Sequence, residues 1–315
     1  MVDILVATYN GEKYILAQLL SLLFQSYREI RILVHDDGST DSTREIVNEI
    51  ATKDNRVRLV EDGITLGSAS RNFMHLLKYS SSDVVMFCDQ DDIWFDNKID
   101  TMLSVLKEKD SNTPQALFSE SYVWEPEIGI EGIAHLNHPK ILTDYLFLNS
   151  GLRGCCAMFN KPMRDLMLRW QGDLIMHDYV LGLLALTLGE VSYVPQKLML
   201  YRRHKGAVTA EYVPNPSLWN RFYENRHAPV IEAKHYETAS RFLEIYGGAL
   251  SEVQRKIFSE YLKMKDASFS QQILSVLQNR FRIRESSLLL LAKLILRPHF
   301  GELHLNTQRG GGQGL

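Results

Sequence analysis

The chain has 315 residues, of which 45% are apolar and 23% charged, so a disordered chain is excluded and one large core or two smaller ones can form. Its net charge of -3 and pI near 6.4 give no general attraction for polyanions, and we expect no nucleic-acid partner. The three cysteines show no paired spacing that would indicate a disulfide framework or a zinc site, which favours a reducing cytoplasm.

The first 120 residues alternate short apolar runs with longer helical patterns. Strands are expected near residues 3–7, 31–35, 57–60, 83–88 and 116–119, and helices near 12–25, 41–51, 69–79 and 97–108. The chain enters the first strand directly, without the charged and apolar regions of a secretory signal. This alternation predicts an α/β fold whose mostly parallel, Rossmann-like sheet is flanked by helices.

The second half is less regular. We expect a helix near residues 177–188 and a pair of short strands near 190–201, followed by a helical pattern to about Leu296. The longest uncharged stretches, residues 14–27 and 179–189, fall short of the roughly 18–20 residues that a membrane-spanning helix needs. They are expected to be buried helices.

Polar residues follow three of the expected strands. These loops are Thr8-Tyr9-Asn10-Gly11, Asp36-Asp37-Gly38-Ser39-Thr40-Asp41 and Asp89-Gln90-Asp91-Asp92. In such sheets ligands bind beyond the carboxyl ends of the strands, so the three loops predict a binding site at one edge.

The acidic loop after the fourth strand gives the sharpest signal. Asp89, Asp91 and Asp92 must repel one another unless a cation or a set of donors neutralises them. Hard oxygen ligands suit Mg²⁺ or Mn²⁺, and such an ion could bridge the phosphates of a nucleoside diphosphate. The alternative, a solvated acidic turn, fits poorly with the apolar residues 93–95 that follow.

Two other segments could contact a nucleotide. A carboxylate of Asp36 or Asp37 could accept hydrogen bonds from a base or ribose, although turn and capping chemistry is the alternative. From Gly67, small residues begin a helix and allow a ligand to approach closely, and Arg71 could pair with phosphate. Tight packing of helix on sheet would also require small residues.

Two candidates lie further along the chain. Asp178 begins an apolar helix, where it could accept a hydroxyl proton or could only interact with the helix dipole. His204 follows a strand within a cationic cluster, where it could complete a metal shell or could simply be exposed. The sequence has no Walker motif and no G-x-G-x-x-G, which argues against an ATPase or a dinucleotide dehydrogenase.

Taken together, these motifs have the order found in one enzyme family. The runs Ala7-Thr8-Tyr9-Asn10-Gly11-Glu12, Asp36 to Asp41, Leu66 to Asn72 and Asp89 to Trp94 resemble family-two glycosyltransferases. The runs Asp89 to Trp94, His177-Asp178-Tyr179 and Tyr201 to His204 are similar to its bacterial rhamnosyltransferase-like branch, which builds capsule, O-antigen and cell-wall polysaccharide. The resemblance implies a GT-A fold and an inverting, single-displacement transfer from a nucleotide sugar.

The resemblance also implies a role for each matching position. Thr8, Tyr9, Glu12 and Asp37 would hold the nucleoside, and Gly67 and Arg71 would line the same pocket. Asp89 would lie by the ribose and sugar, and Asp92 would touch the donor sugar or acceptor. Asp91 would bind Mn²⁺ or Mg²⁺ with help from His204, and Asp178 would be the general base. The donor would be deoxythymidine diphosphate rhamnose or a uridine diphosphate hexose, and the acceptor a saccharide or lipid-linked glycan. The catalytic domain would span residues 1–210, followed by a helical region at 211–305 and a flexible tail at 306–315.

The C-terminal pattern and two rival functions leave alternatives open. Residues 268–299 hold five Lys or Arg and one acid beside apolar blocks, which fits an interfacial helix at anionic lipid, a helix docked on the catalytic domain, or a homo-oligomer contact. The resemblance favours peripheral contact at the cytoplasmic face of the inner membrane. The rival functions are a nucleotidyltransferase, which typically needs a Gly-rich basic loop after the first strand, and a catalytically inactive nucleotide-sugar-binding protein, against which the intact acids argue.

Overall fold

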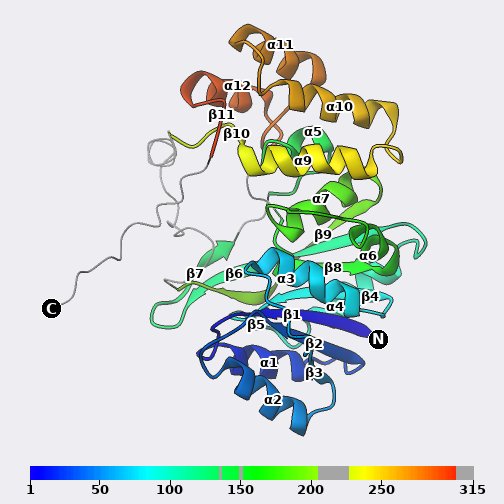
Figure 1. Cartoon of the computed structure of the whole chain (residues 1–315), viewed down its shortest axis with the longest axis vertical. Coiled ribbons are helices and arrows are strands. Elements are labelled where there is room, and N and C mark those ends of the chain that lie inside the picture. Colours follow the sequence, from blue (N-terminus) through cyan, green and yellow to red (C-terminus); the bar gives the residue numbers. More distant parts are fainter. Residues whose placement is uncertain (135–136, 149–151, 205–226, 303–315) are drawn as a thin grey trace, which may run out of the picture.

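The computed structural model describes residues 1–134, 137–148, 152–204 and 227–302. Their main sheet has nine strands in the order β3-β2-β1-β4-β8-β6-β9-β5, with β7 paired to β6 (Figure 1). The strands are β1 Val2–Thr8, β2 Ile30–Asp36, β3 Val57–Leu59, β4 Val84–Asp89, β5 Ile93–Trp94, β6 Gln115–Glu125, β7 Gly129–Ala134, β8 Ala157–Asn160 and β9 Glu190–Arg202. The helices in this part are α1 Ile15–Leu23, α2 Thr43–Lys53, α3 Ala69–Leu76, α4 Lys98–Lys107, α5 Leu142–Tyr145, α6 Lys161–Met167 and α7 His177–Thr187, with short 3₁₀ helices η1 Leu77–Tyr79 and η2 Gly154–Cys156.

The N-terminal half of the sheet is parallel. Strands β3, β2, β1 and β4 run side by side in one direction, and every residue of β1 is buried. Such continuous apolar strands are typical of a parallel sheet covered on both faces. The predicted α/β fold is confirmed, and these four strands begin and end within one residue of the predicted limits.

The C-terminal half of the sheet is mixed. Strand β8 is antiparallel to β4 and β6, whereas β9 is parallel to β6 and antiparallel to β5. The prediction of two short strands near 190–201 is wrong, because β9 is one strand of 13 residues. The register shifts where Val194 pairs with Ser119 and Lys197 pairs with Glu120, which leaves Pro195 in a bulge. Proline cannot donate to the ladder, yet a bulge accommodates it, so the strand continues in the same direction.

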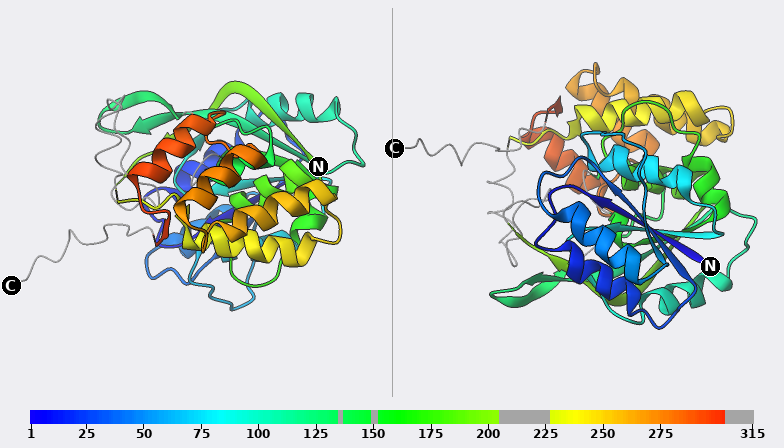
Figure 2. Two further views of the ribbon diagram at one scale, coloured as in Figure 1. Left: turned by 90° about the horizontal axis from the view of Figure 1, so that it is seen from above. Right: turned by 60° about the horizontal axis from the view of Figure 1, so that its bottom comes forward.

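Four helices form a layer at the end of the molecule remote from β3 (Figures 1 and 2). They are α9 Ala233–Tyr246, α10 Glu252–Lys263, α11 Phe269–Asn279 and α12 Ser287–Leu296, beside the strand pair β10 Ile231–Glu232 and β11 Phe300–Gly301. The layer docks on the sheet domain, since the Tyr246 hydroxyl donates to the Leu166 carbonyl at 2.9 Å and Phe147 contacts the rings of Tyr261 and Phe281.

The prediction that the C-terminal part of the chain is helical to about Leu296 is confirmed from residue 233 onward. The tail predicted at 306–315 lies outside the described residues, as does the predicted boundary at 210–211. Over the parts of the chain that the structure describes, the helices are too short or too polar to cross a bilayer.

Candidate active site

Hydrogen bonds join the loops that follow β1, β2 and β4. The Tyr9 amide donates to Gln90 Oε1 at 3.0 Å, and Gln90 Nε2 donates back to the Tyr9 carbonyl at 3.0 Å. Asn10, at a φ of 47°, donates from its amide to Ser39 Oγ at 2.8 Å and accepts from the Thr40 amide at 2.9 Å. Asparagine tolerates this left-handed conformation better than most residues. The three loops therefore meet at one sheet edge, as the strand pattern predicts.

The two acids after β2 have different partners. Asp36 accepts from the Thr8 hydroxyl at 3.0 Å and from the Ser39 amide at 2.9 Å, so this residue follows the turn interpretation. Asp37 accepts from the backbone amides on both sides of Gly67 and thereby fixes the loop that leads into α3. Gly67 has a φ of 66°, which a residue with a side chain would adopt only with strain.

The predicted nucleoside contacts lie around this edge with differing exposure. The Tyr9 side chain is exposed, whereas Thr8 is buried with its hydroxyl already bonded. The Glu12 carboxylate accepts from the Ser42 amide at 3.1 Å, and Arg71 forms an exposed ion pair with Asp173 at 2.7 Å. A role for these residues in binding a nucleoside stays a prediction.

Three carboxylates crowd the carboxyl end of β4. Burial raises the pKa of Asp89 to about 7, and repulsion from Asp91 contributes. Burial and the same neighbours raise the pKa of Asp92 well above its ordinary value. Asp92 Oδ1 accepts from the Arg202 amide at 3.0 Å, but its buried Oδ2 has no hydrogen-bond partner among the described residues. An unsatisfied buried carboxylate oxygen is costly unless a cation or a donor reaches it.

Asp91 points toward the end of β9. Its Oδ2 lies 2.7 Å from His204 Nε2, and its carbonyl accepts from Arg202 Nε at 2.6 Å. The His204 ring packs against Tyr14 at a centroid distance of 4.6 Å. A carboxylate and an imidazole whose ligand atoms lie 2.7 Å apart suit Mn²⁺ or Mg²⁺, so the chemistry of these side chains fits the predicted ion.

A second group of possible ligands lies beneath this pair. Oxygen atoms of Asp89 and Asp92 and the sulfur of Cys155 lie within 4.8 Å of one another. A hydrogen bond with Cys156, together with burial, raises the pKa of Cys155 well above its ordinary value. The thiol is therefore neutral at pH 7 and donates to Asp89, so it serves as a hydrogen-bond donor rather than as an anionic ligand.

Helix α7 brings Asp178 beside the acids of β4. The Gly154 amide donates to Asp178 Oδ2 at 3.1 Å, and burial raises the pKa of Asp178 to about 6. The adjacent residue, Cys155, donates to Asp89, so two consecutive residues of η2 connect the two acids. Residues that are 89 positions apart in the sequence are thus connected through η2, although the proposed base role stays a prediction.

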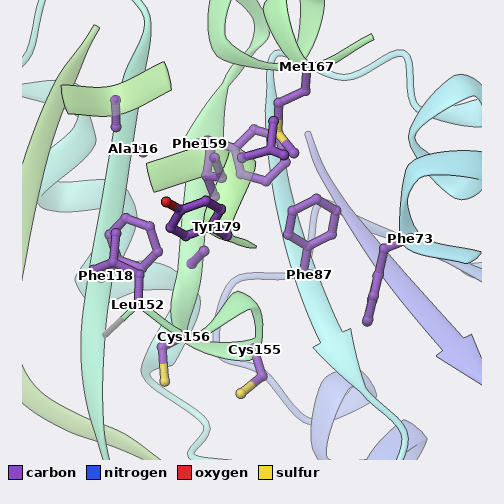
Figure 3. Close-up of a cluster of buried hydrophobic side chains, with 14 of the residues drawn as sticks. Phe73, Phe87, Ala116, Phe118, Leu152, Cys155, Cys156, Phe159, Met167 and Tyr179 are labelled. Carbon is purple, nitrogen blue, oxygen red and sulfur yellow. The ribbon is translucent and has the colours of Figure 1, made fainter. Parts of the chain in front are cut away.

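Aromatic packing fixes the start of α7. The buried His177 ring lies 4.2 Å from the Phe73 ring and 4.6 Å from the Phe87 ring, both of which are drawn in Figure 3. Phe87 also contacts Phe159, so α3, β4 and β8 share one cluster. Only glycine fits at Gly154, because a Cβ there would lie 2.3 Å from His177 Nε2.

Sequence reasoning missed three residues that organise the site. Gln90 ties the β1 and β4 loops, Arg202 ties β9 to two acids, and Cys155 donates to Asp89. Gln90 and Arg202 lie inside motifs that the sequence singles out, but their partners are about 80 and 110 residues away. The neighbouring cysteines give no local signal of a contact with β4.

The fold and this edge together define a nucleotide-sugar transferase of GT-A type. The chain belongs to glycosyl transferase family 2, whose family model matches residues 3–165. The chain is therefore a glycosyltransferase, and the predicted family is confirmed.

Relatives and solved structures agree with this assignment. The dTDP-rhamnosyl transferase RfbG of Shigella flexneri is 29% identical over 212 residues, which cover 64% of this chain and 72% of RfbG. The Escherichia coli enzyme WfgD, a UDP-Glc:alpha-D-GlcNAc-diphosphoundecaprenol beta-1,3-glucosyltransferase, is 38% identical over 107 residues, 34% of this chain and 41% of WfgD.

S. aureus TarS in complex with UDP-GlcNAc has a TM-score of 0.58 at 19% identity, and the match covers 87% of this chain and 79% of the TarS chain. Mannosyltransferase PcManGT from Pyrobaculum calidifontis, in complex with GDP-Man and Mn²⁺, has a TM-score of 0.51 at 16% identity over 94% of this chain and 85% of its own. These structural matches establish the fold.

The loop network predicts the effect of one added methyl group. In Gly11→Ala the new Cβ would lie 2.2 Å from Gln90 Oε1, so Gln90 must move and its two hydrogen bonds with Tyr9 break. We expect donor affinity to fall about tenfold while the free energy of unfolding changes by less than about 1 kcal/mol, because the end of Gln90 can swing into solvent. Nucleotide titration and denaturant unfolding measure the two effects. In the control Gly248→Ala, the added Cβ meets nothing within 4 Å. Unchanged donor affinity in Gly11→Ala would mean that this loop does not shape the donor site.

Proposed function

We propose that this chain transfers a hexosyl group, with inversion, from a nucleoside diphosphate to a hydroxyl of a growing, lipid-linked bacterial surface polysaccharide. Rhamnose on deoxythymidine diphosphate is the first candidate donor and a uridine diphosphate hexose the second. The single observation that carries the proposal is that Gly154 and Cys155, consecutive residues of η2, donate to Asp178 and to Asp89 of β4. In this proposal residues 1–210 form the catalytic domain and residues 211–305 its helical cover.

Asp178 is the proposed general base. The backbone amides of Gly154, Tyr179 and Asp178 donate to its carboxylate, and this carboxylate is proposed to accept the proton of the acceptor hydroxyl as well. As that proton moves to Asp178, the hydroxyl oxygen bonds to the anomeric carbon, and the bond from this carbon to the diphosphate oxygen breaks with its electron pair. A base whose pKa is raised to about 6 is matched to transfer near neutral pH.

Asp91 and His204 are the proposed metal ligands. A bound Mn²⁺ or Mg²⁺ would supply positive charge to the departing diphosphate. The unpaired oxygen of Asp92 and the 2.7 Å distance between Asp91 Oδ2 and His204 Nε2 support a cation here, and PcManGT is in complex with GDP-Man and Mn²⁺. Asp89 is proposed to lie by the ribose and sugar, and Asp92 by the sugar or acceptor.

The nucleoside is proposed to bind where the three loops meet. Exposed Tyr9 and Arg71 can contact the donor directly, whereas Thr8 and Asp37 support it by holding the strand ends and the Gly67 loop. The name of RfbG supports a deoxythymidine diphosphate donor, whereas the name of WfgD contains UDP-Glc and TarS is in complex with UDP-GlcNAc.

The base assignment predicts a loss of turnover without a loss of donor binding. We expect Asp178→Asn to lower kcat by about 10²–10⁴-fold while the donor Kd stays within about twofold. In the unchanged enzyme, activity should fall as pH drops through about 6, because Asp178 with its raised pKa then carries the proton it must accept. The matched control is Asp165→Asn on α6, a half-exposed acid that forms ion pairs with Lys161 and Arg164. Near-normal turnover in Asp178→Asn would disprove this role.

The metal assignment is tested by product analysis. We expect a nucleotide-sugar panel to give nucleoside diphosphate only with Mn²⁺ or Mg²⁺, and Asp91→Ala to lower turnover by at least about 10²-fold. Formation of a nucleoside triphosphate and a sugar 1-phosphate from a nucleotide sugar and added pyrophosphate would instead indicate a nucleotidyltransferase. Donor binding without any product would indicate an inactive sensor, and full activity in chelator would exclude the ion.

The C-terminal helices offer a surface for the lipid-linked acceptor. Leu274 and Leu277 of α11 and Leu288 and Ile295 of α12 are each more than half exposed. Burial lowers the pKa of the neighbouring Lys293 to about 8, and three arginines at 280, 282 and 284 join the two helices. Apolar side chains beside cations suit an anionic lipid surface, so we place the peripheral contact with the cytoplasmic face of the membrane here.

Vesicle sedimentation tests this surface. We expect binding to phosphatidylglycerol vesicles but not to phosphatidylcholine vesicles, and Leu288→Glu should weaken binding at least about tenfold because it removes one inserted leucine. The control is Val253→Glu, an exposed apolar residue on α10. Equal binding by both variants would exclude the α12 surface. Self-association that only Leu288→Glu abolishes would assign the surface to a second copy of the chain.

A further inference from the structure

Two histidines and an aspartate from three separate elements converge near the sheet edge, outside the acid cluster. His35 lies on β2, Asp62 in the loop after β3, and His75 on α3. His35 Nε2 is 3.3 Å from Asp62 Oδ1, and His75 Nε2 is 2.5 Å from Asp62 Oδ2. The side chains of both histidines are buried or nearly so, whereas Asp62 keeps partial access to solvent.

The hydrogen bonds of Asn72 fix the proton on His35. Asn72 Nδ2 donates to the His35 carbonyl at 3.1 Å, which turns Asn72 Oδ1 toward His35 Nδ1 at 2.8 Å. Because Oδ1 can only accept, Nδ1 must carry the hydrogen. The Nε2 atom of a neutral His35 therefore presents a lone pair to a carboxylate oxygen. Two acceptors face each other, so a cation or an added proton is required between them.

We propose that His35, Asp62 and His75 bind a Zn²⁺ ion. Two imidazole nitrogens and one carboxylate oxygen, within 4.8 Å of one another, match the ligand types of a three-ligand zinc site with its fourth position open to water. A ligating histidine usually donates its second nitrogen to a polar partner, as His35 does to Asn72. The Tyr79 hydroxyl and the Ile64 amide donate to the two Asp62 oxygens at 2.7 and 3.0 Å and orient the carboxylate.

The site has an entry path and a structural consequence. His75 also lines a surface groove of about 370 Å³ together with Arg71 and Met74, which gives an ion access from solvent. Asp62 begins the loop whose other end is held by Asp37 on both sides of Gly67. A zinc ion would therefore tie this loop to both β2 and α3. The inference concerns the stability of the loop and does not depend on the transfer reaction.

Zinc binding to the whole chain, measured by competition with a chromophoric chelator in excess Mg²⁺, tests the proposal. We expect one Zn²⁺ per chain at this cluster, and at least about 100-fold weaker binding in Asp62→Asn and in His75→Gln, which keep the size of the side chains. The control His138→Gln alters a partly exposed histidine beside Glu120 and should bind as the unchanged protein does. Asp91→Ala identifies any zinc held in the acid cluster, since only that portion should disappear.

A thermal measurement keeps the test decisive if a variant folds poorly. Zinc should raise the Tm of the unchanged protein and of Asp91→Ala, but not that of Asp62→Asn, because only a ligand bound to the folded state raises Tm. Equal zinc affinity in the unchanged protein and in both folded cluster variants would overturn the proposal. The proposal would also be overturned if the cluster bound no Zn²⁺ and NMR at neutral pH showed His35 as an imidazolium, because the added proton would then lie between His35 and Asp62.

Discussion

The repulsion among buried carboxylates at the end of β4 is the constraint around which the rest of the structure is arranged. Asp89 and Asp178 have pKa values raised from 3.8 to about 7 and about 6, so the folded chain binds more protons than the unfolded chain between about pH 4 and 7. Their contribution to stability is therefore present below pH 4 and is lost as pH rises through the folded values. At neutral pH these carboxylates carry negative charge, and a bound cation would reduce the repulsion between them. Such a free-energy cost at a strand end is typical of a functional site.

The surroundings of the acids offset part of this repulsion without removing it. Lys98 is fully buried under the cluster, where its ammonium group donates to the Cys155 carbonyl at 2.6 Å and lies 3.6 Å from the centre of the Trp94 ring. Burial lowers the pKa of Lys98, while nearby Cys156 and Asp92 are among the groups that oppose this shift. A cation beneath the acids thus stabilises Asp92 from the core side.

Local patterns predict those features that depend on local physics. Apolar runs mark the four parallel strands, and the polar residues after them mark the edge where the loops meet. The different hydrogen-bond partners of Asp36 and Asp37 depend instead on which backbone amides lie near each carboxylate in the folded loops. The spacing of residues in the sequence does not predict these partners. The cluster of His35, Asp62 and His75 joins positions up to 40 residues apart through elements that only the sheet order brings together. The continuity of β9 was missed for another reason, since Pro195 reads as a strand break in a sequence but lies in a bulge here.

The same strand β9 contacts the acids that follow β4. The family model ends at residue 165, before Asp178 and His204, so it includes the loops after β1, β2 and β4 but not α7 or the end of β9. Arg202, at the end of β9, joins this strand to the acids. Its backbone amide donates to Asp92, and its guanidinium donates to the Asp91 carbonyl and packs over the Trp124 ring. A shift of β9 must change both contacts at once, because backbone and side chain of one residue make them. Anything that displaces the end of β9 therefore acts on Asp91 and Asp92 together.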